Sequence, residues 1–192
     1  MSNLQQALSI MDEANSQDPN LETVNGKKMP KELMYARRMT EWLEKRAPDA
    51  SEALRLAARC QHIERWVIPR EDYPMTRPGY LKWRNELKKY HADRAGEILK
   101  EAGYPEEQIR NVQDLVMKRG LKSNPEAQIL EDVACLVFLD AYFEEFSRKH
   151  PEEKLIRILQ KTWRKMSEKG REMALQLPLS DNAQKLMEKA VA

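Results

Sequence analysis

The feature that most constrains the fold is a seven-residue run, Val133 to Leu139, in which every residue is apolar. The run lies inside a segment with helical character that begins near Pro125, after the capping residue Asn124, and is predicted to extend to about Lys149. A helix that is apolar on every side must be surrounded by other helices. We therefore predict that this segment is the centre of a helical bundle.

Apolar residues recur every three or four positions in most of the remaining chain, which predicts amphipathic helices. Segment 18–30 contains two prolines, a glycine and two asparagines and is predicted to be a loop. No segment shows the sustained alternation typical of strands. We predict a single all-α domain covering 1–192, a bundle of about seven or eight helices. Besides the central helix, the predicted helices are 3–16, 31–47, one from a cap at Asp49 or Ser51 to Val67, 77–102, 105–119, 152–176 and 181–190.

Charge and composition exclude several classes of protein. The chain has 33 Lys and Arg against 31 Asp and Glu, and this net charge of +2 is too small for non-specific binding of nucleic acid. No apolar run approaches the roughly 18 residues of a membrane span, and the N-terminus lacks the pattern of a secretory signal. Cys60 and Cys135 belong to no CxxC motif, so we expect reduced core thiols in a cytoplasmic protein.

Chemically distinctive residues are concentrated between Leu54 and Arg94. This window holds His62 and His91, separated by a loop rich in proline, arginine and tyrosine. On a helix over 77–102, Arg84, Lys88 and His91 would share one face and could hold a phosphate or a carboxylate, although a solvated basic face explains such a row about as well. The predicted ligand-binding residues are Arg65, Trp66, Arg70, Arg77, Tyr80, Arg84 and Lys88.

Three further residues are candidates for catalysis: His62, Glu131 and Asp132. His62 falls at helical spacing from apolar neighbours and is predicted to face the interior. Asp132 shares a face with two leucines of the apolar run, and a carboxylate there is costly to bury unless it is paired, ligated or hydrogen-bonded. The alternative is a carboxylate that the dipole near a helix N-terminus stabilises.

Three segments resemble the HD-domain superfamily of metal-dependent phosphohydrolases, which have an all-α fold. The resemblance implies an HD-like core over about 31–150, on which C-terminal helices over 152–192 would pack. It also implies a divalent metal ion (Mn, Fe, Ni or Zn) held by His62, His91 and Asp132. The resembling segments, in order, are LAARCQHI at 56–63, HADRAGEIL at 91–99 and ILEDVA at 129–134.

The chain departs from the HD pattern at two positions. The His-Asp pair of that superfamily reads Gln61-His62 here, and Tyr35 stands where an early histidine is expected. Over its whole length the chain is also similar to an uncharacterised family, through the stretches QHIxRWxIPR and YPMxRxGYLxWRxxLKxxH. That second resemblance implies no reaction.

The leading hypothesis is a metal-dependent hydrolase of a phosphorylated small molecule or nucleotide, in which the metal activates water and the basic residues hold the phosphate. The alternative is a catalytically inactive HD-like protein that binds an anionic metabolite or an RNA. A third hypothesis, a scaffold that binds other proteins through segment 164–192, is weaker because that segment is mostly polar.

Overall fold

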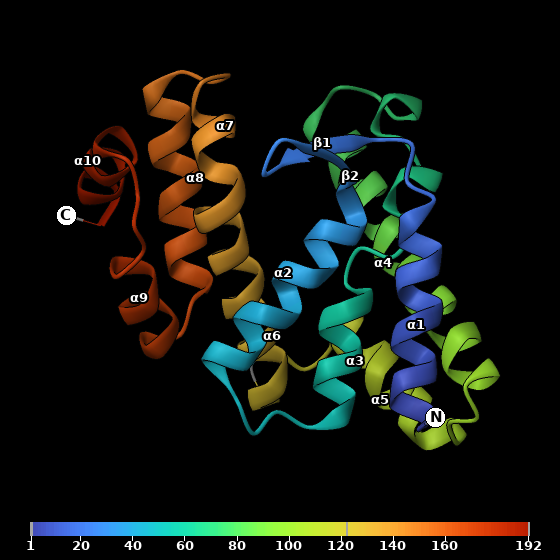
Figure 1. Cartoon of the computed structure of the whole chain (residues 1–192). Coiled ribbons are helices and arrows are strands. Elements are labelled where there is room, and N and C mark those ends of the chain that lie inside the picture. Colours follow the sequence, from blue (N-terminus) through green and yellow to red (C-terminus); the bar gives the residue numbers. More distant parts are fainter. Residues whose placement is uncertain (1, 122, 192) are drawn as a thin grey trace.

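The computed structural model describes residues 2–121 and 123–191, and these are mostly helical (Figure 1). Two short 3-10 helices, η1 (Arg65–Val67) and η2 (Arg70–Asp72), precede the longest helix, and a π-helix, η3 (Phe138–Tyr142), follows the most apolar one. Strands β1 (Leu21–Val24) and β2 (Lys27–Pro30) form an antiparallel hairpin. The α-helices are α1 (Asn3–Ser16), α2 (Lys31–Arg46), α3 (Glu52–Cys60), α4 (Arg77–Glu101), α5 (Glu106–Val116), α6 (Pro125–Val137), α7 (Phe143–Ser147), α8 (Glu152–Lys165), α9 (Glu168–Leu175) and α10 (Asp181–Val191).

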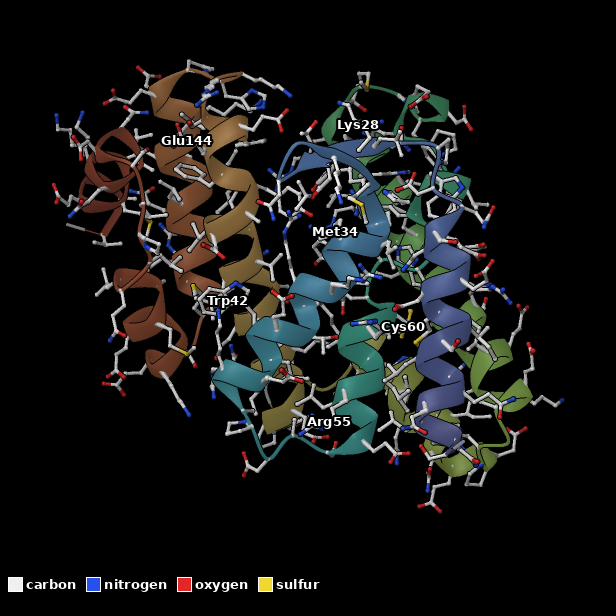
Figure 2. All side chains as sticks on the ribbon, viewed as in Figure 1. Lys28, Met34, Trp42, Arg55, Cys60 and Glu144 are labelled. Atoms are coloured by element: carbon white, nitrogen blue, oxygen red, sulfur yellow. The ribbon has the colours of Figure 1, made fainter. Side chains whose placement is uncertain are left out.

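Two hydrophobic cores divide the helices. Helices α7 to α10 lie on one side and α1, α3, α4 and α5 on the other, with α2 and α6 between them (Figure 1). The buried residues of α1 to α6 form the first core, and the end of α6 forms the second with α7 to α10. Trp42 of α2 packs against both cores and lies at their boundary (Figure 2). None of the helices within 2–121 and 123–191 is long and apolar enough to cross a membrane.

Local sequence signals set most helix starts. The Ser2 hydroxyl accepts a hydrogen bond from the backbone N–H of Gln5, whose side chain accepts one from the Ser2 backbone in return. Ser51, Thr76 and Asn124 cap α3, α4 and α6 in the same way, each with its own side-chain oxygen. Four predicted helices agree with the structure to within one residue at each end, 3–16, 31–47, 77–102 and 181–190, and of these α1 and α4 begin at such a cap.

The prediction of a loop over 18–30 is wrong, because this segment contains the hairpin. Asn25 and Gly26 both have positive φ, at 49° and 78°, which is the geometry of a tight two-residue hairpin turn. Each strand has only four residues, too few to show a clear alternation in the sequence. The Asp18 carboxylate accepts a hydrogen bond from the backbone N–H of Glu32 at 2.9 Å, which fixes the hairpin to the start of α2.

The third predicted helix ends at Cys60 instead of continuing to residue 67. Glu64, four residues later, has a left-handed backbone with φ of 49°. Its backbone N–H donates to Asn15 Oδ1 at 3.0 Å, and its carboxylate accepts from Tyr90 and Arg94 at 2.8 and 2.9 Å. Partners that lie far away in the sequence thus hold this turn, which local periodicity cannot reveal.

The predicted helix over 125–149 is divided into α6, η3 and α7. The wider turn of the π-helix brings the Tyr142 hydroxyl within 2.7 Å of Arg38 Nη1. It also places Asp140 so that its carboxylate accepts from the indole of Trp42 at 3.0 Å. The predicted helix over 152–176 is likewise divided, because Ser167 caps a new helix, α9.

Asp132 is fully buried and joins three helices. Its Oδ2 accepts hydrogen bonds from Arg46 Nε and Nη2 of α2, at 3.0 and 2.9 Å. Its Oδ1 accepts from the backbone N–H of Ser167 at 2.8 Å and from Gln128 at 3.1 Å. At Gly170 of α9 a Cβ would lie 2.7 Å from the Asp132 carboxyl carbon, so the helix approaches this carboxylate as closely as a glycine allows.

We expect Asp132→Asn to lower the free energy of unfolding by about 3–5 kcal/mol, because it leaves the guanidinium of Arg46 buried without a counter-charge. Chemical denaturation at neutral pH measures this. The control is Asp114→Asn, which breaks an exposed pair with Arg119 and should cost less than about 1 kcal/mol. Equal stability of the two variants would contradict a structural role for Asp132.

Candidate functional site

A cleft of about 870 Å³ opens between the hairpin and the 61–76 connection that joins α3 to α4. Both segments lie at the same end of the helices (Figure 1). Three residues predicted to bind a ligand, Arg65, Trp66 and Arg70, line this cleft. The full lining is Pro19, Asn20, Leu21, Lys31, Glu32, Arg65, Trp66, Ile68, Pro69, Arg70, Glu71 and Trp83.

Trp83 of α4 holds the two arginines of the cleft in place. The guanidinium carbon of Arg65 lies 4.8 Å from the centroid of its indole, and that of Arg70 lies 5.8 Å away. Arg70 also donates to the carbonyl oxygens of Tyr73 and Pro74 at 2.9 and 3.0 Å. These contacts order the cationic side chains before any ligand arrives, which lowers the entropic cost of binding.

Behind the arginines lies a small cluster of Glu32, Tyr35, His62 and His91. The rings of Tyr35 and His62 stack with centroids 4.0 Å apart and an interplanar angle of 10°. His62 Nδ1 lies 3.5 Å from Glu32 Oε2, and the ring of His91 lies 6.0 Å from that of His62. Glu32 and His91 are buried, whereas 26% of the His62 side chain is exposed. Solvent therefore reaches the cluster at His62 and at the half-buried Tyr35.

Hydrogen bonding fixes the tautomer of both imidazoles. His91 Nδ1 lies 2.8 Å from the carbonyl oxygen of Ile63, which only accepts, so Nδ1 carries the proton. Burial, together with the neighbouring His62, lowers the pKa of His91 to about 3, so its Nε2 is a bare acceptor. His62 Nε2 lies 3.3 Å from Nη1 of Arg65, a donor, so the proton of His62 sits on Nδ1. Burial and the cations Arg65 and Lys118 lower the pKa of His62 well below its usual value.

Two atoms of this cluster have no hydrogen-bond partner. Burial raises the pKa of Glu32, although the nearby Arg65 opposes the shift. Glu32 Oε2 is buried and unpaired, and so is His91 Nε2. Buried polar atoms are almost always satisfied in folded proteins, so two orphans beside one imidazole indicate a place where another molecule binds.

Arg84 and Lys88, also predicted to bind a ligand, lie half-buried on α4 outside the cleft lining. Burial, and then Arg84 and Lys118, lower the pKa of Lys88. Glu131 opposes this shift of the pKa of Lys88, and its own ion-pair partners are Lys118 and, at 3.5 Å, Lys165. Burial opposes the effect, but these lysines hold the pKa of Glu131 below its usual value. Glu131 is thus an acceptor for lysines, with no contact that supports the predicted catalytic role.

Arg77 and Tyr80 lie on the exposed face of the first turns of α4. The guanidinium carbons of Arg70 and Arg84 lie 5.9 and 5.7 Å from the Tyr80 ring centroid. Tyr80 therefore contacts an arginine of the cleft from outside it.

The predicted metal site of His62, His91 and Asp132 is not assembled. Asp132 is saturated by Arg46, Ser167 and Gln128. Within 2–121 and 123–191, no group of three or more His, Cys, Asp or Glu side chains is arranged to hold a metal ion. The cations that lower the pKa of His62 would also repel a divalent metal. The residues at the site therefore do not fit the metal that the HD resemblance implies.

Lys31, Glu32 and Trp83 also line the cleft, although they are not among the binding residues predicted from the sequence. A signal existed for Glu32, which begins the buried stripe of α2 that continues through Ala36, Met39 and Leu43. An acid in register with an apolar stripe is costly to bury and for that reason a candidate for function.

The neutral state of His91 makes stability depend on pH. Its pKa is about 3 when folded and roughly 6.5 when unfolded, so the unfolded chain binds more protons in acid. Stability is complete above about pH 6.5 and falls, by at most about 1.4 kcal/mol per pH unit, as the pH drops toward 3. Denaturation between pH 7 and pH 4 measures the slope, which His91→Asn should reduce. Imidazole NMR provides a second test, because a ring that becomes protonated near pH 6.5 would contradict this account.

A model of one protein family matches residues 5–187 of the chain, described as domain of unknown function (DUF4202). No curated protein and no solved structure matches it significantly. The family match confirms the predicted similarity of the whole chain to an uncharacterised family, and nothing in the comparisons links the chain to the HD superfamily. Because the match covers nearly the whole length, the chain belongs to the DUF4202 family.

Proposed function

We propose that the protein binds a small phosphorylated molecule in the cleft between the hairpin and the 61–76 connection. The observation that carries the proposal is the uncompensated positive charge of Arg70. Its guanidinium donates to two carbonyl oxygens and contacts aromatic rings, and in the described part of the chain no carboxylate pairs with it. Such a group is ready to bind an anion.

The neighbouring residues support an anionic ligand of small size. Lys31 and Arg65 add positive charge to the same cleft, whereas Glu71 and the buried Glu32 are the acids of its lining. A volume of about 870 Å³ falls within the range of small-molecule sites, roughly 300–1,000 Å³. The indole of Trp66 adds an apolar surface for the rest of the ligand.

Isothermal titration calorimetry with inorganic phosphate, sn-glycerol 3-phosphate and D-ribose 5-phosphate tests the proposal, with glycerol and ribose as uncharged controls. We expect only the phosphorylated compounds to bind. Arg70→Gln should weaken binding by about tenfold or more, because it removes a charge-assisted hydrogen bond. The matched control is Arg110→Gln on the exposed face of α5, which should have no effect.

Two results would overturn the proposal. One is an absence of binding by every phosphorylated compound, and the other is an equal loss of affinity in both arginine variants. A single-stranded RNA that binds in an Arg70-dependent way, where the small phosphates do not, would identify RNA as the ligand instead.

Hydrolysis of the bound phosphate ester is a second candidate function. The specific observation that favours it is the carboxyl of Glu32 3.5 Å from His62 Nδ1, an arrangement that can orient an imidazole for proton transfer. The relation to the HD-domain phosphohydrolases belongs to this hypothesis. The relation to the HD superfamily rests on the order of His62, His91 and Asp132 along the chain. The hydrogen bond that Arg46 donates to Asp132 weakens this relation.

Release of inorganic phosphate from the same esters tests this second candidate. We expect turnover that EDTA leaves unchanged and that His62→Gln abolishes while ligand binding persists. Turnover that EDTA abolishes and Mn or Zn restores would support the metal-dependent version instead. If the protein binds phosphate esters but releases no phosphate from them, its function is binding without hydrolysis.

A further inference from the structure

The unpaired atoms Glu32 Oε2 and His91 Nε2 carry information about the ligand beyond its charge. Both residues are more than nine-tenths buried, with exposed fractions of 7% and 3%. They flank the same imidazole, that of His62, whose Nδ1 lies 3.5 Å from Glu32 Oε2 and whose ring lies 6.0 Å from that of His91. We call the surroundings of these two atoms the inner compartment, and Glu32, which also lines the cleft, joins it to the proposed phosphate site.

The two unpaired atoms need hydrogen-bond partners of opposite kinds. His91 Nε2 is an acceptor, because Nδ1 of the same ring donates to the carbonyl of Ile63. Burial raises the pKa of Glu32, which favours its protonated form, and that form offers a donor at the carboxyl group. One chemical group that both accepts and donates can satisfy both atoms. That group is a hydroxyl, which accepts from the Glu32 acid and donates to His91.

Other groups fit this compartment less well. A carboxylate has no proton to give to His91 Nε2, and an ammonium group would be repelled by Arg65 and by Lys118, which both act on the adjacent His62. An apolar group would leave both buried atoms unsatisfied. The donor and acceptor pattern therefore favours a hydroxyl over a carboxylate, an ammonium group or an apolar group.

We propose that the ligand is a hydroxylated phosphate ester, a polyol or sugar phosphate, whose hydroxyl bridges Glu32 and His91 while its phosphate lies among Arg65, Arg70 and Lys31. This inference rests on the proposed function and names the class of ligand. In this proposal the carbon chain of the ligand packs against the exposed part of His62, 26% of its side chain, and against the ring of Tyr35 stacked on it.

Calorimetry with matched ligand pairs tests the inference. The pairs are sn-glycerol 3-phosphate with 1-propyl phosphate and D-ribose 5-phosphate with 1-pentyl phosphate, which differ in whether they carry hydroxyls. In at least one pair the wild-type protein should bind the hydroxylated member about tenfold or more tightly, because the alkyl ester leaves buried polar groups unpaired.

Variants of Glu32 and His91 then test whether these two residues cause the preference for the hydroxylated ligand. His91→Asn keeps a donor for the Ile63 carbonyl and removes the free acceptor, so the ratio of affinities should fall toward one while the alkyl phosphate binds as before. Glu32→Leu should do the same. Glu32→Gln keeps a donor and should retain the preference. Arg70→Gln is the control, and it should weaken both members of a pair equally.

The possible failures are distinguishable. If phosphate and all the esters fail to bind, the proposed function falls and the inference falls with it. If both members of each pair bind with equal affinity and Arg70→Gln weakens both, the phosphate site stands and the hydroxyl inference is overturned, with water occupying the compartment. A preference that persists in both His91→Asn and Glu32→Leu would also overturn it, because the hydroxyl would then be bound elsewhere.

Discussion

The buried contact between Asp132 and Arg46 is the interaction on which the rest of the structure depends. It joins α6 to the C-terminal end of α2, and through Ser167 it attaches α9 as well. A buried ion pair contributes little net stability compared with apolar packing, but it penalises every arrangement in which one partner lies buried alone. The pair therefore fixes how the two hydrophobic cores meet along α2. The opposite end of that helix carries Glu32 and Tyr35, so the same constraint positions the site.

Asp132 and Glu32 are both buried acids, and their surroundings assign them opposite roles. Five donor groups of Arg46, Ser167 and Gln128 satisfy the carboxylate of Asp132. By contrast, Oε2 of Glu32 has no hydrogen-bond partner, and Arg65 approaches its other oxygen only to 4.0 Å. A satisfied charge serves the fold, whereas an unsatisfied buried polar atom costs stability that a bound ligand can restore. Asp132 is a candidate for function because a carboxylate beside apolar residues is costly to bury. It is indeed buried, but this cost does not distinguish a structural acid from a ligand-binding one.

Whether a feature of the fold can be predicted from the sequence depends on how far apart along the chain its interacting residues lie. Helix starts at Ser51, Thr76 and Asn124 depend on residues two or three positions apart, so local patterns predict them. The end of α3 depends on contacts of Glu64 with α1 and α4, which no local pattern contains. In the window around His62, which the sequence marks as chemically distinctive, Arg65 and Arg70 line a cleft together with Glu32 of α2. The burial cost makes Asp132 a candidate for function and the HD resemblance makes it a metal ligand, but its contacts with Arg46, Gln128 and Ser167 place it elsewhere.

Tyr35 shows why the site differs from the metal centre that the resemblance implies. It stands where a histidine ligand is expected, and its ring lies flat on His62 with centroids 4.0 Å apart. Burial, together with the nearby Glu32, raises the pKa of its phenol far from neutrality, so it offers no anionic oxygen to a metal ion. The stacked ring instead holds His62 in one orientation, with Nδ1 toward Glu32 and Nε2 toward Arg65. A tyrosine at this position therefore forms part of the wall of the site and does not act as a metal ligand. The positive charge around His62 remains available to bind an anion.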